Sequence, residues 1–437
     1  MKVSRSFASV FIALNAATVV VVLVIVLQWP AQVIIPKEQP PAALEIRERI
    51  GLLAPDPDWS ELEPYQDTIT HDEFESALTS VYSAGDAWKA AVRISDTYAD
   101  VDTQDGKGFR LRFAARQADK APKRYWRGAS ELPSIKAGSD RPLQGMRIVI
   151  DPGHIGGKWA QKEERWYSIV KGTEVMEGTM TLQVAKLLKP QLEKLGATVF
   201  LTREATEPVT NMRPADFEEA AANYLQSIGK DPQRNKRALE FERDKMFFRT
   251  QEIRTRAWLI NDIFQPDLVL CLHFNAESWG NPRKPKFVDR NHLHLIVNGT
   301  YSLSEMRLHD QCFDMMQRIL QRTHSEETAA STVVAKAMAE ATDLPAFRYG
   351  GSNAQPAGDS EYVWARNLLA NRLYDCPTVF LEPYVMNNEE VHDRIRIGDY
   401  EGKRPINGRM LKSIFREYAD GVAEGVRAYY AGKRAGK

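Results

Sequence analysis

The chain has 437 residues, of which 43% are hydrophobic and 27% are charged, with 58 basic and 58 acidic side chains. This length accommodates two globular domains, and the apolar content excludes a disordered chain. The charge is balanced and scattered, which argues against nucleic acid as a partner, because nucleic-acid-binding domains normally carry a clustered basic excess. The three cysteines are too few for a disulfide scaffold, so the fold must rest on ordinary hydrophobic burial.

The N-terminal segment, residues 1–29, has the features of a transmembrane anchor. No charged residue occurs between Arg5 and Lys37, and this stretch is long and apolar enough to cross a bilayer core of about 30 Å as a helix. Lys2 and Arg5 precede the span, so the positive-inside rule places the short N-terminus in the cytoplasm and the rest of the chain outside. In a cell with an outer membrane, that location is the periplasm. The alternative is a cleaved signal peptide, whose apolar core is normally shorter.

Three segments precede the main domain. Residues 30–58 are rich in proline, which is typical of a stalk. Residues 59–127 contain one helix with capping-box spacing and two short strands, at 90–94 and 109–113, and no catalytic constellation. We therefore expect a small α+β accessory domain here. Residues 128–145 contain glycine, serine and proline and are predicted to be a linker.

The main domain, residues 146–437, alternates between strand and helix patterns. Such alternation predicts an α/β fold with a mostly parallel central sheet and helices on both faces. In open sheets of this kind, ligands bind beyond the carboxyl ends of the strands. The expected strands are 146–150, 198–202, 268–272, 293–297 and 378–381, and the expected helices include 179–195, 253–264 and 408–430.

Candidate chemical groups follow three of these strands. His154, His273 and Glu382 come after strands 146–150, 268–272 and 378–381, and Glu177 begins the first helix. Two imidazoles and a carboxylate can provide zinc with three protein ligands and leave its fourth position for water. Zinc lowers the pKa of bound water to about 7, and a further carboxylate could move the proton to a leaving nitrogen. The spacing alone is only suggestive, because a single histidine at a strand end is more often structural.

Four sequence blocks in this part of the chain occur in a distinctive order. Residues 143–154 run from Leu-Gln-Gly through an apolar strand to Asp-Pro-Gly-His. Glu177 precedes a helix and then Leu-Thr-Arg at 201–203, residues 266–276 contain Leu-His-Phe-Asn-Ala, and residues 377–382 end in Phe-Leu-Glu. Together the blocks resemble the zinc-dependent N-acetylmuramoyl-L-alanine amidases of the amidase-3 type, over residues 143–430 or about two thirds of the chain.

The resemblance implies a function and a set of site residues. It implies Zn²⁺ held by His154, Glu177 and His273, with Glu382 as the catalytic residue. It also implies peptidoglycan as the substrate, cleaved at the amide between the lactyl group of N-acetylmuramic acid and L-alanine. Two alternatives stay open: a non-catalytic wall-binding or divisome scaffold protein that keeps the amidase fold, and a zinc peptidase acting on stem peptides.

The chain departs from the family pattern around the first two ligands. Ile155 interrupts the usual His-Gly-Gly, and residues 158–171 replace a short glycine-rich loop. Glu174 therefore competes with Glu177 as the metal ligand. We favour Glu177, because its distance to the Leu-Thr-Arg at 201–203 is that of the family.

Two further features have more than one interpretation. Residues 204–250 form an insertion with the pattern of a helical hairpin, which is either a solvated decoration or a lid or partner-binding arm, and therefore a candidate site for a protein activator. We expect it to emerge beside the metal site and to limit substrate access. His292 and His294 alternate on one strand face, which favours a polar strand face over a second metal site.

Overall fold

The computed structural model describes residues 35, 38, 49–103, 106–116, 122–278, 280–281 and 284–435. The predicted anchor, residues 1–29, and most of the predicted stalk lie outside the described residues. Within the described part of the chain, no helix is both long enough and apolar enough to span a bilayer. Contacts group residues 39–437 into one compact unit, and the fold described below is that of this unit.

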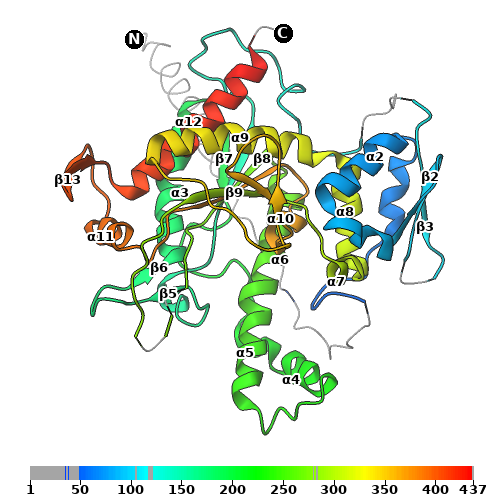
Figure 1. Cartoon of the computed structure of the whole chain (residues 1–437), viewed down its shortest axis with the longest axis horizontal. Helices are drawn as coiled ribbons and strands as arrows, with labels where there is room; N and C mark the ends of the chain where they lie inside the picture. Colours follow the sequence, from blue (N-terminus) through cyan, green and yellow to red (C-terminus); the bar gives the residue numbers. More distant parts are fainter. Residues whose placement is uncertain are drawn as a thin grey trace, which may run out of the picture. The chain divides into compact units, whose positions relative to one another are not determined.

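A seven-stranded sheet forms the centre of the molecule (Figure 1). β7, β4, β8 and β12 pair in parallel, whereas β9 runs antiparallel to β12. The predicted α/β class with a mostly parallel sheet is therefore confirmed. In spatial order the strands are β10 (Gln355–Pro356), β11 (Val363–Ala365), β9 (Leu293–Val297), β12 (Thr378–Pro383), β8 (Leu268–Leu272), β4 (Arg147–Pro152) and β7 (Thr198–Leu201).

Helices cover both faces of this sheet. On one face, α3 (Glu177–Lys194), α9 (Thr323–Thr342) and α12 (Ile414–Arg434) share a single apolar core with alternate strand residues. Helix α12 packs closely against α9, because a Cβ atom added to Gly425 would lie 2.6 Å from the Cα atom of Val334. On the other face, the ring of Phe264 stacks on that of Phe200 with centroids 4.9 Å apart.

The C-terminal helix begins later than the sequence pattern suggests. Helix α12 starts at Ile414, whereas we expected a start at residue 408. A two-stranded hairpin of β13 (Arg404–Ile406) and β14 (Arg409–Leu411) precedes it. Asn407 and Gly408 both have positive φ angles, 47° and 78°, as a two-residue type I′ turn requires. The Asn-Gly pair was thus a turn signal that the helix prediction overlooked.

The N-terminal elements pack onto a helix of the main domain. Helix α2 (His71–Ala77) has the predicted capping box, and a three-stranded antiparallel sheet follows it, of which the middle strand was not predicted. Phe74 and Leu111 lie in one apolar core with Phe313 of α8 (His309–Gln321). The division of the chain into domains at 127 and 145 stays a prediction. The small sheet consists of β1 (Val92–Ile94), β2 (Tyr98–Val101) and β3 (Phe109–Arg112).

The segment that we expected to be a linker packs on the main domain. Ala129, Leu132 and Leu143 are buried in the core formed by α3, α9, α12 and the sheet. At its start, the Arg127 guanidinium forms an ion pair of 2.7 Å with the buried carboxylate of Asp267. Residues 128–145 are therefore part of the packed structure.

The insertion at residues 204–250 forms the predicted helical hairpin. Its two arms are α4 (Glu218–Ser227) and α5 (Lys236–Met246), and they project away from the sheet in Figure 1. The second arm continues without a break into α6 (Glu252–Trp258), which belongs to the main domain. At the base, Phe217 and Phe247 join an apolar cluster that includes Ile155. The base of the hairpin is thus anchored next to the loop that follows β4.

Candidate active site

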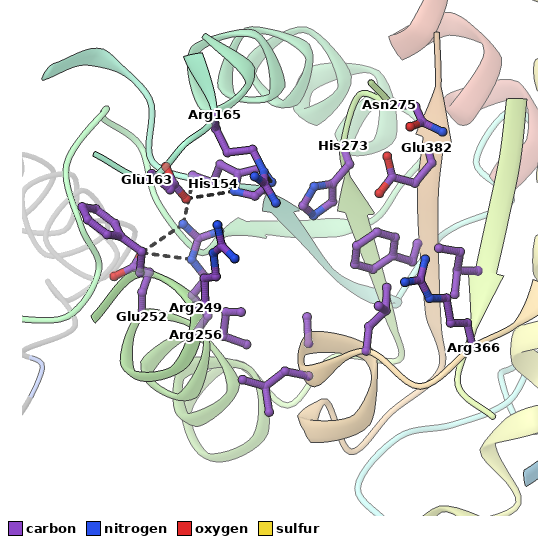
Figure 2. A pocket seen from close by; sticks show the side chains of 18 of the residues that line it. His154, Glu163, Arg165, Arg249, Glu252, Arg256, His273, Asn275, Arg366 and Glu382 are labelled. Carbon is purple, nitrogen blue, oxygen red and sulfur yellow. Dashed lines mark hydrogen bonds and ion pairs between the residues drawn. The ribbon is translucent and has the colours of Figure 1, made fainter. Parts of the chain in front are cut away.

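A cavity of about 440 Å³ opens where β4, β8 and β12 end at the same edge of the sheet. His154, His273 and Glu382 all line it (Figure 2). These three residues were predicted because they follow parallel strands. The parallel pairing of β4 with β8 and of β8 with β12 brings their carboxyl ends together, as the rule for open α/β sheets requires.

Two buried arginines hold the turn that carries His154. Arg256 donates a hydrogen bond of 2.9 Å from Nη2 to the carbonyl oxygen of His154, and Arg203 donates one of 3.0 Å from Nε to that of Pro152. His154 itself has a φ of 59°, which is uncommon for a residue with a side chain. Gly153 is required by packing, since a Cβ atom there would lie 2.3 Å from the His273 ring.

Arg256 belongs to a buried ionic network below this turn. Its guanidinium lies 3.0 Å from Asp151 and 3.0 Å from Glu252. Asp151 also accepts a hydrogen bond of 2.7 Å from the Tyr374 hydroxyl. Burial tends to raise the pKa of Asp151, but the charge of Arg256 and these hydrogen bonds outweigh it and lower the pKa. Glu252 also accepts a hydrogen bond from the backbone N–H of Val209, so the network contacts the base of the insertion.

The structure brings His154, Glu177 and His273 together. Glu177 Oε2 lies 3.3 Å from Nε2 of His154, and its Oε1 lies 3.1 Å from Nδ1 of His273. One ligand atom of each residue lies within 4.8 Å of the others, and no other described group of His, Cys, Asp and Glu side chains is arranged to hold a metal. Glu174, the competing candidate, is exposed and outside this group.

The charges of the three side chains are strongly interdependent. Burial would raise the pKa of Glu177, yet the neighbouring His154 and His273 lower it to about 2. Burial also disfavours protonated His273, but the hydrogen bond that its Nδ1 donates to Glu177 and the charge of Glu382 raise its pKa. For His154, burial dominates and lowers the pKa. Glu177 is therefore held as a carboxylate between the two imidazoles.

Glu382 lies near the end of β12 and is the second carboxylate of the site. Burial raises its pKa to about 8, and the charge of Glu177 contributes in the same direction. Because β9 is antiparallel to β12, Glu382 is paired in register with His294, near the start of β9. A carboxyl group with such a pKa can exchange a proton near neutral pH, as a general acid–base group must.

Two further residues at the site come from the stretch 158–171. Glu163 is buried, with Oε1 2.9 Å from Nδ1 of His154 and Oε2 accepting the Ile155 N–H at 3.0 Å. Arg165 donates a hydrogen bond of 3.1 Å from Nε to His154 Nε2. The sequence marked this stretch as a departure from the family, but no pattern in it indicated which side chains face the site.

His292 directly precedes β9 and His294 lies within it, and both side chains are buried. All five residues of β9 are buried, and the ring of Phe347 lies 4.5 Å and 4.9 Å from the two imidazole centroids. His294 lines the cavity and contacts the Tyr349 hydroxyl at 3.0 Å through Nε2. Burial lowers the pKa of His294 to about 3, so this histidine is neutral. Each histidine has a polar partner, Glu277 for His292 and Tyr349 for His294, so the two form a polar pair that is buried beside Phe347.

The insertion contributes little to the cavity. Of its residues, only Phe248 and Arg249 line the cavity, and both lie at the base of the hairpin. The two arms, α4 and α5, project away from the sheet in Figure 1. The expectation that the insertion limits substrate access stays a prediction.

Comparisons with known proteins identify a matching family and several relatives. The family model described as N-acetylmuramoyl-L-alanine amidase matches residues 148–414. The chain is 36% identical over 85 residues to a probable cell wall amidase, LytH, of Staphylococcus saprophyticus, which is 20% of this chain and 27% of the relative. The match thus spans about a quarter of that relative's length.

Two solved amidase structures align with most of the same region. One is an N-acetylmuramoyl-L-alanine amidase from Clostridium difficile 630, with 16% identity, a TM-score of 0.34 and coverage of 64% of this chain and 95% of that chain. The other is the amidase Ami1 from Mycobacterium abscessus, with 17% identity, a TM-score of 0.35 and coverage of 66% of this chain and 99% of that chain.

Proposed function

This chain belongs to the N-acetylmuramoyl-L-alanine amidase family, and on that premise we propose that it is a zinc-dependent peptidoglycan hydrolase. The bond cleaved is the amide between the lactyl group of N-acetylmuramic acid and L-alanine of the stem peptide. The observation that carries the proposal is the meeting of His154, Glu177 and His273 beside the cavity that Glu382 lines.

The donor set fits zinc better than the hard divalent cations. Two imidazole nitrogens and one carboxylate oxygen are ligands of catalytic zinc sites, whereas calcium and magnesium prefer oxygen alone. Glu163 occupies Nδ1 of His154, so Nε2, which accepts a hydrogen bond from Arg165 in this structure, is the atom that would bind the metal in place of that contact. Zinc, when bound, lowers the pKa of water to about 7 and polarises a substrate carbonyl.

The protein residues then supply positioning and proton transfer. Glu382 accepts a proton from the attacking water and returns it to the leaving nitrogen, because its carboxyl group is buried and its pKa is raised to about 8. Asn275 lines the same wall of the cavity, where its amide can bind the peptide. Gly153 leaves room for the His273 ring, so that the two histidines can approach each other.

The test is mass analysis of the fragments that the purified protein releases from sacculi. An amidase leaves glycan strands free of peptide and releases stems with a free L-alanine amino group. A peptidase on stem peptides would leave L-alanine attached to the glycan, and a binding protein would release nothing. The Glu382→Gln protein is the matched control, since it keeps the shape of the site. Intact muramyl–alanine amides after digestion would refute the proposal.

We also propose that residues 1–29 anchor the enzyme in the cell membrane, with the catalytic part outside the cytoplasm. The support is the uncharged apolar stretch between Arg5 and Lys37. N-terminal sequencing of the membrane-extracted protein checks this, because an intact anchor keeps the residues before Trp29. A soluble mature protein that starts beyond Trp29 would instead show a cleaved signal peptide.

A third part of the proposal is a protein partner at residues 204–250. The hairpin projects from the body, and it exposes Ile228 and Phe241, each with 47% of its surface accessible. Replacing both with serine should leave zinc content and turnover of soluble muramyl peptides unchanged but lower wall cleavage in cells. If the purified variant instead lost turnover of soluble muramyl peptides to the same extent as wall cleavage, the hairpin would be part of the catalytic fold.

A further inference from the structure

Arg366 lines the cavity without a carboxylate partner of its own. It follows β11, and its only side-chain hydrogen bond in the described part of the chain is one of 3.4 Å to the Tyr349 hydroxyl. We propose that Arg366 binds a carboxylate of the stem peptide next to the cleaved amide, and thereby selects acidic over amidated stems. This inference rests on the proposed function, because it names the substrate class of the same site.

The other arginines of the cavity already have anionic partners. Arg256 is buried between Asp151 and Glu252, Arg249 forms an ion pair with Glu164, and Arg165 lies 3.6 Å from Glu177. For Arg366, no carboxylate of the described residues lies within ion-pair distance. In Figure 2 it points into the cavity from the wall opposite Arg249 and Arg256. Arg366 is thus the arginine of this cavity whose charge is available to a ligand.

Neighbouring aromatic side chains hold Arg366 in place. Its guanidinium carbon lies 5.5 Å from the centroid of the Tyr349 ring, within the range of a cation–π contact. The Tyr349 hydroxyl accepts the hydrogen bond from Arg366 and is in turn 3.0 Å from Nε2 of neutral His294. This chain of contacts fixes the guanidinium before a ligand arrives, which lowers the entropic cost of binding.

The cavity that Glu382 lines extends along one face of the sheet to Arg366. Along β12 the floor passes from Glu382 to Phe380, which is paired with Ile296 of β9. Arg366 follows the strand on the other side of β9. The backbone N–H of Arg366 bonds to the carbonyl of Val297, so its Cα lies beyond the level of Phe380. Its side chain extends back along the cavity, and its charge lowers the pKa of Glu382. A stem with its amide at Glu382 therefore meets the guanidinium further along the same cavity, through a carboxylate beyond L-alanine.

The positive charge of Arg366 favours a carboxylate at its end of the cavity. A stem whose second residue is γ-linked D-glutamate carries a free α-carboxylate at this position. In D-isoglutamine that group is a neutral amide, which accepts a weaker hydrogen bond from a guanidinium.

The test uses two muramyl tripeptides that differ only in having D-glutamate or D-isoglutamine as the second residue. We expect the wild-type enzyme to prefer the glutamate substrate by about 10- to 100-fold in kcat/KM, the usual contribution of a hydrogen bond to a charged group. Arg366→Gln should abolish the preference by slowing only the glutamate substrate, and Arg366→Lys should restore part of it. Tyr349→Phe should weaken the preference without changing zinc content.

Arg348→Gln is the matched control, because this neighbouring arginine is exposed and paired with Glu361 outside the cavity. It should keep the full preference. Equal kcat/KM for the two substrates in the wild type, or equal losses for both in Arg366→Gln, would overturn the inference. If the wild type hydrolyses neither substrate, the proposed function fails separately. In that case the role of Arg366 is tested by calorimetric titration of the wild-type protein with the same two peptides. Equal affinities for the D-glutamate and D-isoglutamine peptides would overturn that role.

Discussion

The carboxylate of Glu163 lies 2.9 Å from Nδ1 of His154, on the side of the ring that faces away from Glu177. Its second oxygen accepts the backbone N–H of Ile155, so both ends of the carboxylate are fixed. A carboxylate in this position sets the tautomer and orientation of a metal-binding imidazole and increases its basicity. The structure thus contains a positioning residue that the family pattern does not supply.

Removal of Glu163 should therefore weaken metal binding. We expect Glu163→Ala to lower zinc affinity by about 10- to 100-fold, because His154 loses its orienting partner. Zinc affinity measured by competition with a chelator checks this, and Glu163→Gln should be less affected, since its amide can still hydrogen-bond to the ring. Glu164→Gln is the control, because its side chain is 57% exposed. Equal affinities for the wild type and Glu163→Ala would contradict this role.

The three predicted ligands should each be needed for zinc. Alanine at His154, Glu177 or His273 should empty the site, since two remaining ligands are too few for a tight site. Metal analysis of each purified variant measures this directly. Glu174→Ala should keep full occupancy, because Glu174 is exposed and lies outside the cluster. The reverse result for Glu174 and Glu177 would move the assignment to Glu174.

Glu382 should be needed for turnover but not for the metal. In Glu382→Gln the amide keeps the shape of the side chain and cannot accept the proton, so turnover should fall by about 10²- to 10⁴-fold. Zinc content should remain that of the wild type. Near-normal turnover with zinc bound would assign the general base to another residue.

Loss of one partner from a buried ion pair away from the cavity should strongly lower the free energy of unfolding. Arg318 and Glu327 contact each other with 1% and 0% of their side chains exposed. Glu327→Ala leaves an uncompensated buried charge, which should lower the free energy of unfolding by about 3–5 kcal/mol. Urea unfolding of the protein checks this. The double variant Arg318→Met with Glu327→Met should be less destabilised, and equal destabilisation of the two proteins would argue that lost packing is the cause.

The sequence by itself determined the α/β class and the residues that meet at the cavity. The apolar runs before His154 and His273 are long enough to be buried strands and too short for helices, so both histidines had to lie at strand ends. Parallel pairing then brings those ends to one edge of the sheet. The helical hairpin within residues 204–250 could also be predicted from the sequence, because turn residues interrupt two helical patterns there.

Only the tertiary structure decided which other side chains reach the site. Glu163 lies in a loop without periodicity, so its contact with His154 depends on a loop conformation that no local pattern encodes. His294 faces the cavity because β9 runs antiparallel to β12, a direction that strand patterns do not reveal. Strand patterns report burial and period, whereas the direction and order of pairing follow from packing among residues far apart in the chain.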